Sequence, residues 1–467
     1  MTPPFDAQQI VEWTGGQQLR GRGDESFEDV SIDSRRLRGG ELFVAIRGPN
    51  HDGHGFLAQA LAAGAKGLLV AGEKQPEISI PSETVVIRVV DTTRALGALA
   101  AGFRRGFGGP VIAVTGSNGK TTTKEMCAAI LSVRGPCLKN EGNLNNEFGL
   151  PLTLLARRPE HLAAVVELGM NHRGEIARLA AIARPDVAVV TNVGTAHIEF
   201  LASREEIARE KGDLLAALDP DGVAVINRDD PLVVGQVPRT TARVMGFGRG
   251  PEAEVRSAGV RDLDEGAYTF DLQTPEGSTP VRVAGLGETT VINALAAAAA
   301  ALAAGASLED VATGLGRHQP IRGRMARLAL AGEITLIDDS YNANPQSVRA
   351  ALESLARHKG TGRGVAVLGD MGELGEAAEE AHRNAGREAA ELGIDFLIAL
   401  GDYAELLADA AVQSGMDGRR VRVAKEHDQV NDALLEILRP RDWVLVKGSR
   451  AMKMERVVET LVARKEA

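Results

Sequence analysis

A glycine-rich turn at residues 115–119 carries residue types that bind phosphate. It reads T-G-S-N-G and is followed directly by a lysine and threonines. The apolar run V-I-A-V precedes the turn and a helical pattern follows it, which is typical of a strand–loop–helix unit in a parallel sheet. Backbone N–H groups of such a loop surround phosphate oxygens, the lysine contacts the β- and γ-phosphates, and a threonine coordinates Mg²⁺. The candidate phosphate-binding residues are Thr115, Gly116, Ser117, Asn118, Gly119, Lys120, Thr121 and Thr122.

This turn departs from the strict Walker A pattern, which has a glycine where this chain has Val114. The shorter form T-G-x-N-G-K-T remains. Because G-K-T also occurs by chance in loops, a glycine turn with a solvated lysine is the alternative interpretation. The flanking strand and helix, and the threonines around Lys120, favour the phosphate site.

Polar groups also follow three buried strands in the middle of the chain. Glu167 ends A-A-V-V-E, His197 follows D-V-A-V-V-T-N, and Asp230 follows G-V-A-V-I-N. Ligands of parallel sheets gather at the carboxyl ends of strands, so we expect these groups at one common edge. A carboxylate at that edge would hold Mg²⁺ or orient water. Each group taken alone has the alternative role of a loop cap.

Lys211 is placed unusually for a charged residue. Ser203 and Glu206 form a capping-box pattern that predicts a helix start, and Lys211 falls within the apolar stripe of that helix. A lysine in that place usually extends its amine to water along the apolar surface. The alternative is a desolvated amine with a lowered pKa, neutral enough to react.

Composition places the chain among ordinary globular proteins. It has 467 residues, 44% hydrophobic and 25% charged, so we expect about three domains. The net charge of −10 argues against a nucleic-acid or membrane-surface binder. Two cysteines fit a reducing cytoplasm without disulfides, and no signal or membrane-spanning run is present. We therefore expect a cytoplasmic protein, with the alanine-rich tract at 293–304 as a packed helix.

The pattern of strands and helices predicts an α/β protein with three domains, 1–108, 109–320 and 321–467. The first is a small unit with two polar clusters, 31–36 and 47–54, that suit a diphosphate or sugar or are solvated turns. The second repeats strand and helix around the glycine-rich turn. The third resembles a doubly wound, dinucleotide-type domain, in which Asn344 and Pro345 start a helix. It has no G-x-G-x-x-G, so a nicotinamide cofactor is not expected.

Several longer motifs are similar to those of the Mur ligases, the ATP-dependent amide-forming enzymes of peptidoglycan precursor synthesis. They are T-G-S-N-G-K-T-T-T-K, N-E-G-N-L-N-N-E-F-G-L-P, E-L-G-M-N-H-R-G-E-I, T-N-V-G-T-A-H, D-D-S-Y-N-A-N-P, V-L-G-D-M-G-E-L-G and V-K-G-S-R-A-M-K-M-E. The last three resemble the family member that adds D-Ala-D-Ala to UDP-N-acetylmuramoyl-tripeptide. In that reaction ATP converts a carboxylate to an acyl phosphate, which the incoming amine attacks.

The resemblance implies a fold and a set of site residues. It implies an N-terminal UDP-sugar domain, a central P-loop ATPase and a C-terminal Rossmann-like domain that closes the site. Catalysis would fall to Lys120, Glu167, His197 and Lys211. Of two Mg²⁺ ions, one would be held by Thr121 and Glu167, the other by His197 and a carbamate on Lys211. Other nucleotide contacts would be Asn293, Arg324, Asp339 and Asn342, and substrate contacts Ser31, Ser34, Arg35, Arg47, Asn143, Asn145, Asn146, Tyr341, Asn344, Lys447 and Ser449.

The chain differs from the family at residues 288–290. Family members often carry G-x-H-N before the N-A-L-A-A helix near the adenine, whereas here Gly287 is followed by Glu-Thr-Thr. Two other enzymes of this architecture remain alternatives: the ligase that adds the third amino acid, and a folylpolyglutamate synthase. A nucleotide-gated binding module without catalysis is a third. We expect a monomer that acts on small molecules and neither binds nucleic acid nor inserts into membranes.

Overall fold

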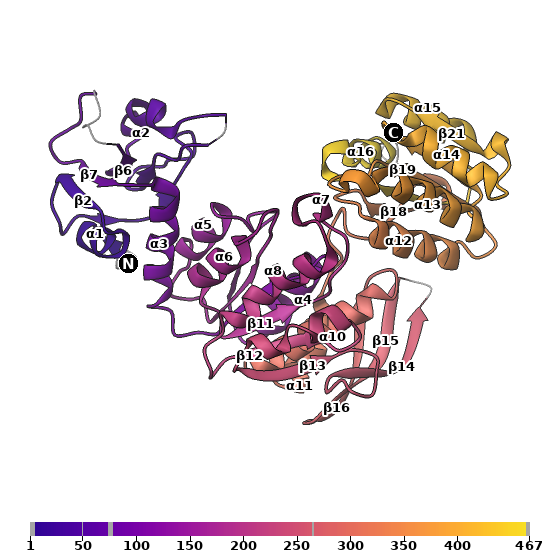
Figure 1. Cartoon of the computed structure of the whole chain (residues 1–467), viewed down its shortest axis with the longest axis horizontal. Coiled ribbons are helices and arrows are strands. Elements are labelled where there is room, and N and C mark those ends of the chain that lie inside the picture. The colour runs from indigo at the N-terminus through magenta and orange to yellow at the C-terminus, as the bar shows by residue number, and fades with distance from the viewer. Residues whose placement is uncertain (1–4, 49, 73–77, 264–265, 464–467) are drawn as a thin grey trace.

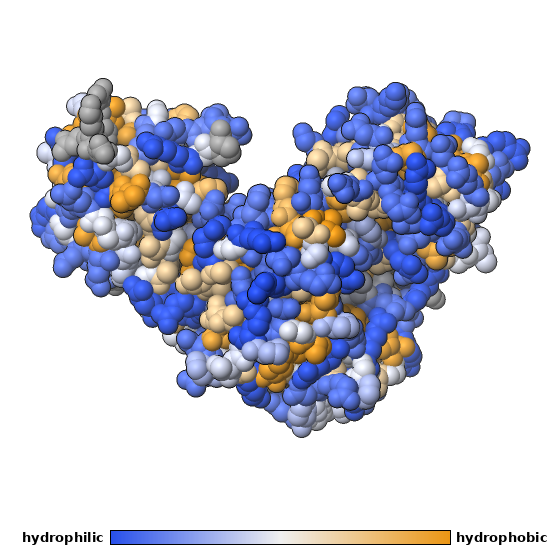
Figure 2. Space-filling view, in the orientation of Figure 1, coloured by the Kyte–Doolittle hydropathy of each residue, from blue (hydrophilic) through white to orange (hydrophobic). Residues whose placement is uncertain are grey.

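The computed structural model describes residues 5–48, 50–72, 78–263 and 266–463, which form three α/β bodies in chain order (Figure 1). The N-terminal and third bodies stand on either side of the central one, and a wide hollow separates them on the molecular surface (Figure 2). The predicted α/β class with parallel sheets is therefore confirmed. None of the helices in these ranges is both long and apolar enough to cross a membrane.

The N-terminal body is built on a five-stranded mixed sheet, ordered β2-β7-β6-β5-β4. Its strands are β2 (Gln17–Arg20), β7 (Val85–Val89), β6 (Gly67–Ala71), β5 (Leu42–Val44) and β4 (Val30–Ser31), of which only β2 runs antiparallel to its neighbour. Strands β1 (Phe5–Asp6) and β3 (Ser26–Phe27) form a separate pair. The helices are α1 (Ala7–Thr14), α2 (Leu57–Ala62) and α3 (Thr92–Arg104).

The central body contains six parallel strands, ordered β13-β12-β11-β8-β10-β9. They are β13 (Arg243–Phe247), β12 (Val223–Asn227), β11 (Val187–Val190), β8 (Val111–Thr115), β10 (Ala163–Glu167) and β9 (Cys137–Lys139). All five residues of β8 are buried, because helices cover both faces of the sheet. These helices are α4 (Lys120–Leu131), α5 (Gly149–Leu155), α6 (Glu175–Ala183), α7 (Ile198–Leu201), α8 (Arg204–Ala216), α9 (Pro231–Val234), α10 (Thr289–Ala303) and α11 (Leu308–Arg317).

An antiparallel sheet of three strands interrupts the strand–helix alternation of the central body. Strands β14 (Arg256–Leu263), β15 (Ala267–Thr274) and β16 (Gly277–Ala284) pair as successive hairpins and pack against α11. The alternation of strand and helix expected for residues 109–320 therefore does not hold in the segment from β14 to β16. The alanine-rich tract, in contrast, is the buried helix α10, as predicted.

The third body is a doubly wound sheet, as the sequence predicts. Its order is β17-β18-β22-β19-β20-β21, with β17 (Ala326–Ala329) antiparallel to β18 (Thr335–Asp339). The parallel strands continue with β22 (Trp443–Lys447), β19 (Gly364–Gly369), β20 (Phe396–Leu400) and β21 (Val421–Ala424). Helices α12 (Pro345–His358), α13 (Ala378–Glu391) and α14 (Ala404–Gln413) join one core cluster, and α15 (His427–Ile437) and α16 (Glu455–Ala463) join the other.

Of the two predicted helix caps, the one at α12 is complete and the one at α8 is only partly formed. Asn344 caps α12 and exchanges hydrogen bonds with Ser347, and Pro345 occupies the first helical position, as expected. At α8 the Ser203 hydroxyl accepts from the Glu206 N–H, but the Glu206 side chain pairs with Arg173 instead of completing the predicted capping box. Short 3₁₀ turns lie at Gly53–Phe56, Val237–Arg239, Ala331–Glu333, Gly375–Ala377, Gly418–Arg420 and Arg450–Met452.

Candidate active site at the glycine-rich loop

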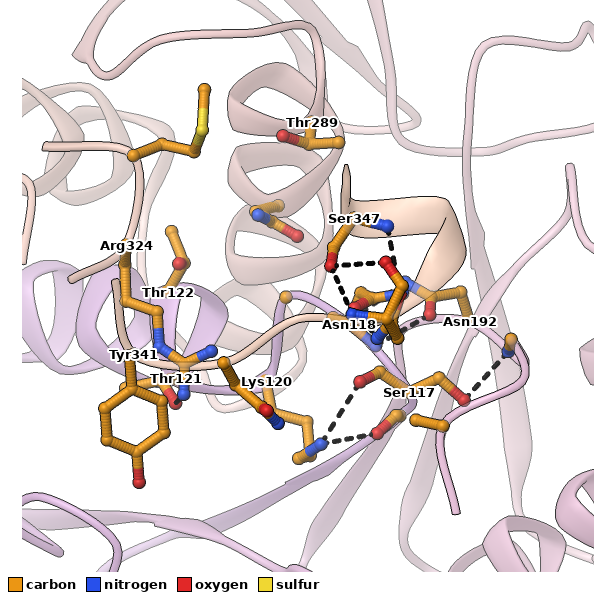
Figure 3. Close-up of a pocket in the computed structure, with 18 of the residues that line it drawn as sticks. Ser117, Asn118, Lys120, Thr121, Thr122, Asn192, Thr289, Arg324, Tyr341 and Ser347 are labelled. Atoms are coloured by element: carbon orange, nitrogen blue, oxygen red, sulfur yellow. Dashed lines mark hydrogen bonds between the residues drawn. The ribbon is translucent and has the colours of Figure 1, made fainter. Parts of the chain in front are cut away.

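The carboxyl edge of the central sheet opens into a cleft of about 1250 Å³, which we call the P-loop cleft. Its walls come from the loop 116–122, the ends of β10 and β11, the start of α10, and residues 320–357 of the third body. Figure 3 shows Arg324 and Tyr341 of the third body lying beside Thr121 of the glycine-rich loop. Two bodies of the protein therefore contribute to one site.

The loop between β8 and α4 has the conformation of a phosphate nest. Gly116 and Gly119 adopt φ angles of 152° and 80°, and a Cβ on either would fall within 2.2 Å of Thr191 or Asn293. Ser117 and Asn118 donate their N–H groups to Asn192, whereas the N–H groups of residues 119–122 reach no acceptor among the described residues. Four free donors at a helix start suit an anion.

Lys120 lies in this loop with its amine turned back over the glycines. Its Nζ donates to the carbonyls of Gly116 at 2.7 Å and Ser117 at 3.4 Å. Burial lowers the pKa of Lys120, and the nearby Glu167 carboxylate opposes that shift. An incoming anion would restore the charge of this amine.

Thr121 and Glu167 meet as the sequence predicts. The Thr121 hydroxyl donates to Glu167 Oε2 at 2.7 Å, and the Asn145 amide donates to Glu167 Oε1 at 2.8 Å. Asn140 fixes the backbone on both sides of this carboxylate, since it accepts from the Glu167 N–H and donates to the Glu167 carbonyl. A hydroxyl and a carboxylate in contact form a pair of hard oxygen ligands.

Lys211 is buried to 1% exposure and does not reach water. Within the described part of the chain the hydrogen-bond partner of its Nζ is Met170 Sδ at 3.8 Å, while the adjacent Glu210 carboxylate accepts from the N–H groups of Gly174 and Ile176. Desolvation, followed by repulsion from Lys120, lowers the pKa of Lys211 well below its ordinary value. Of the two sequence interpretations, the structure excludes the solvated amine.

His197 lies at the start of α7 with φ of 66°, and it lines the P-loop cleft. Its Nδ1 is 2.5 Å from Glu373 Oε2, a carboxylate of the third body. Within the described ranges no three His, Cys, Asp or Glu side chains cluster as a metal site. The ligands predicted for the two ions include Thr121 and Lys211. They therefore do not form a cluster made only of His, Cys, Asp and Glu side chains.

Two amides of the third body contact the central body, one at the glycine-rich loop and one at the loop after β11. Asn344 Nδ2 donates to Asn118 Oδ1 at 2.7 Å, and the Gln346 carboxamide oxygen accepts from the Thr195 hydroxyl at 3.0 Å. Arg324 stacks over the Tyr341 ring at 4.0 Å, with its Nη2 3.4 Å from Thr121 Oγ1. Asn344, predicted as a substrate contact, therefore serves as helix cap and loop contact in this structure.

A buried ion pair supports the far side of the cleft. Lys447 Nζ donates to Asp339 Oδ2 at 2.5 Å and to the Asn342 carbonyl at 2.9 Å. Burial raises the pKa of Asp339 and lowers that of Lys447, and the attraction within the pair opposes both shifts. All three residues line the cleft, as do Asn143, Asn145, Asn146 and Tyr341.

The departure at residues 288–290 lies at the mouth of the cleft. Glu288 accepts from Arg357 at 2.8 Å and pairs with Arg249 at 2.8 Å, so it bridges the central and third bodies. Thr290 Oγ1 donates to the Leu286 carbonyl, whereas Thr289 lines the open space. Asn293, which matches the family motif, packs so closely on the glycine-rich loop that a Cβ on Gly119 would lie 2.2 Å from its Oδ1.

Five predicted substrate residues do not line this cleft. Arg35 and Arg47 pair with Asp33 and Asp52 on the N-terminal body. Ser449 is buried and its N–H donates to Asp370. The remaining two, Ser31 and Ser34, bond to the Asp33 carbonyl and to Gln59.

Sequence reasoning also missed residues that organise the site. Asn140 is the first residue of the motif N-E-G-N-L-N-N-E-F-G-L-P, and Gln346 follows directly after D-D-S-Y-N-A-N-P. Glu373 lies in V-L-G-D-M-G-E-L-G, and only the folded chain brings it to His197. Motif membership was the available signal for Asn140 and Glu373, whereas Gln346 stands one residue beyond its motif.

Models of three Mur ligase domains match the chain in order. The model described as Mur ligase family, catalytic domain, matches residues 26–104; the Mur ligase middle domain matches 114–301; and the Mur ligase, glutamate ligase domain, matches 323–450. The chain therefore belongs to the Mur ligase family, and the resemblance inferred from its motifs is confirmed.

Named relatives match along nearly the whole chain. The UDP-N-acetylmuramoyl-tripeptide–D-alanyl-D-alanine ligase of Escherichia coli (strain K12) is 38% identical and covers 97% of both chains. A crystal structure of MurF from Acinetobacter baumannii is 36% identical, with 98% of this chain and 99% of that chain covered and a TM-score of 0.88. MurF ligase from Thermotoga maritima in complex with ADP is 29% identical, with 94% and 98% covered and a TM-score of 0.82.

Proposed function

We propose that this protein is an ATP-dependent ligase that joins D-Ala-D-Ala to UDP-N-acetylmuramoyl-tripeptide in peptidoglycan precursor synthesis. The observation that carries the proposal is the P-loop cleft, where four free N–H donors face polar groups of a second body. Relatives that bear the name of this reaction match the chain over its length. We place the reaction in the cytoplasm and expect a monomer to suffice, because both walls of the cleft come from one chain.

The residues present fit a nucleoside triphosphate and Mg²⁺. The free N–H groups of residues 119–122 and the desolvated Lys120 would hold the phosphates, with Arg324 opposite them. Thr121 and Glu167 would hold one ion, and His197 and Lys211 the other. ATP would supply the phosphoryl group, and Mg²⁺ would neutralise its charge.

The chemistry explains why such a site needs two bodies. A carboxylate is a poor acyl donor because an amine cannot displace oxide, whereas phosphate is a good leaving group from an acyl phosphate. Water would hydrolyse that acyl phosphate, so the site must exclude it. In this chain Asn344, Gln346 and Arg324 would close the third body over the glycine-rich loop.

We infer a carbamate on Lys211 from its burial. A neutral amine attacks CO₂ through its nitrogen, loses one proton and becomes an anionic oxygen ligand, which suits Mg²⁺. Incubation with ¹³CO₂ should give a carbamate signal in carbon NMR that is absent from Lys211→Ala. Stripping CO₂ should lower activity and bicarbonate should restore it. An unmodified amine under saturating CO₂ and Mg²⁺ would refute the carbamate and leave the ligase assignment standing.

The ligase assignment is tested by product mass spectrometry. Purified protein with ATP, Mg²⁺, UDP-N-acetylmuramoyl-tripeptide and D-Ala-D-Ala should form the pentapeptide product. Lys120→Ala should abolish it, because a cation at the transferring phosphoryl group is lost. Lys425→Ala, an exposed lysine of the third body, is the matched control. Half of normal turnover in Lys120→Ala, or product only with diaminopimelate or glutamate as the amine, would overturn the assignment.

A further inference from the structure

A loop of the third body, residues 370–375 after β19, reaches across to the central body. Glu373 Oε2 lies 2.5 Å from His197 Nδ1, and the Glu373 carbonyl accepts from the Glu199 N–H at 3.3 Å. A Cβ on Gly375 would lie 3.5 Å from Glu199. The loop therefore contacts both His197, which precedes α7, and Glu199 in its first turn.

Interactions inside the third body hold this loop in place. The Asp370 carboxylate accepts from the N–H groups of Asp402 and Tyr403, at 2.8 and 3.1 Å. The Met371 N–H donates to Nε2 of His382, a histidine that is 1% exposed and stacks on Tyr403. The loop therefore arrives at the interface already formed, and its position depends on where the third body sits.

The two residues that meet are both in an unfavourable backbone conformation. Glu373 has φ of 59° and His197 has φ of 66°, a region that residues with a Cβ rarely occupy. Such conformations persist where the surrounding structure requires them, and they cluster at functional sites. Here they direct one carboxylate and one imidazole toward each other.

The contact determines which nitrogen of His197 remains available. Nδ1 is shielded from solvent and forms no standard hydrogen bond among the described residues, so its one polar neighbour there is Glu373 Oε2 at 2.5 Å. Nε2 is left without a partner in the described ranges, on a residue that lines the cleft. A carboxylate on the distal nitrogen is the usual way in which a metal-binding histidine is oriented.

We propose that Glu373 is a positioning residue for His197, so that this histidine becomes a competent Mg²⁺ ligand only when the third body is docked. The proposal rests on the proposed function, since that function supplies the role of His197. Binding of the second ion would then depend on closure, because the orienting carboxylate and the histidine ligand belong to different bodies. When the third body is undocked, His197 would lack the carboxylate that orients it, and the molecule would bind that ion weakly.

Mn²⁺ binding tests this without reference to turnover. Wild type, Glu373→Gly, His197→Ala and the double variant are titrated with Mn²⁺ by electron paramagnetic resonance, with a non-hydrolysable ATP analogue and UDP-N-acetylmuramoyl-tripeptide present. Glycine is chosen because it tolerates the φ of residue 373, so the loop keeps its shape. Glu373→Gly should lower the affinity for the second Mn²⁺ ion about 10–100-fold. The Glu376→Ala variant, which changes an exposed glutamate just after this loop, should bind Mn²⁺ as wild type does.

The double variant separates positioning from an independent effect. If Glu373 acts through His197, the double variant binds no more weakly than His197→Ala alone. Glu373→Gln should recover affinity, because its amide oxygen can accept the Nδ1 proton. Unchanged Mn²⁺ affinity in Glu373→Gly, additive losses in the double variant, or a glutamine variant as weak as glycine would each overturn the proposal. Wild type that binds both ions but forms no product would instead overturn the proposed function.

Discussion

The central body meets its two neighbours through interfaces of opposite character. Toward the N-terminal body the contact is apolar: Leu96, Leu99 and Phe103 of α3 belong to one buried cluster that continues through Leu150 of α5 and Leu179 of α6. Gly97 allows close approach there, since a Cβ would meet Ile182 at 2.9 Å. Burial of this kind resembles a single core, so these two bodies should behave as one unit.

Toward the third body the contact is mostly polar, although Leu286 and Ile198 of the central body join the apolar cluster beneath α12 and α13. The polar contact is made by Asn118 with Asn344, Thr195 with Gln346, His197 with Glu373 and Glu288 with Arg357. Such groups exchange protein partners for water at a small net cost, so the interface can open and close. The boundary with the N-terminal body is therefore continuous, whereas the boundary with the third body, where the P-loop cleft lies, can open.

The largest expected effect comes from breaking the apolar interface. Phe103→Ala should lower the free energy of unfolding by about 3–5 kcal/mol, because it leaves a cavity in the shared core. Urea unfolding followed by circular dichroism measures this. Phe200→Ala, at a phenylalanine that is 43% exposed, is the control and should cost far less. A cost below about 1 kcal/mol for Phe103→Ala would mean that the two bodies are not fused.

Acid should lower the free energy of unfolding through His318, which follows α11 and lines the P-loop cleft. Burial lowers the pKa of this histidine to about 4 from 6.5, so the unfolded chain binds its proton first as pH falls. The stability that this group contributes is complete above pH 6.5 and is lost as the pH falls from 6.5 to about 4, by on the order of 3 kcal/mol. Unfolding of wild type and His318→Gln across this range measures it. Equal acid sensitivity in the two proteins would contradict the assignment.

The smallest effect on stability is expected at the polar interface. Gln346→Ala removes the contact with Thr195 and should change the free energy of unfolding by less than about 0.5 kcal/mol. Product formation should nevertheless fall several-fold, because closure is less favourable. Gln413→Ala, at an exposed glutamine ending α14, is the matched control for both measurements. A loss of stability as large as that of Phe103→Ala would erase the contrast between the interfaces.

The sequence predicted features that depend on local patterns. The strand–loop–helix around Lys120 and the helix start at Asn344 follow from neighbouring residues alone. The hairpins β14–β16 were missed because much of β14 is exposed and its apolar positions do not form a buried run. At Glu206 a partner from another loop, Arg173, replaced the expected cap.

The features that could not be predicted depend on residues far apart in the chain. Whether Lys211 reaches solvent is decided by burial beside Met170, which lies 41 residues away. The pairing of His197 with Glu373 requires the placement of a whole body, which no local pattern encodes. The roles of Ser31, Ser34, Arg35 and Arg47 stay predictions.

The contrast between interfaces is tested most directly by two distances in one protein. Cysteines at the exposed Val90, Leu162 and Val412, in a background of Cys127→Ala and Cys137→Ala, place spin labels on the N-terminal, central and third bodies in pairs. Double electron–electron resonance is recorded with and without an ATP analogue, Mg²⁺ and UDP-N-acetylmuramoyl-tripeptide. The 90–162 distance should be unchanged, while the 162–412 distribution should shift and narrow as the third body closes. A shift across 90–162 with none across 162–412 would contradict the account.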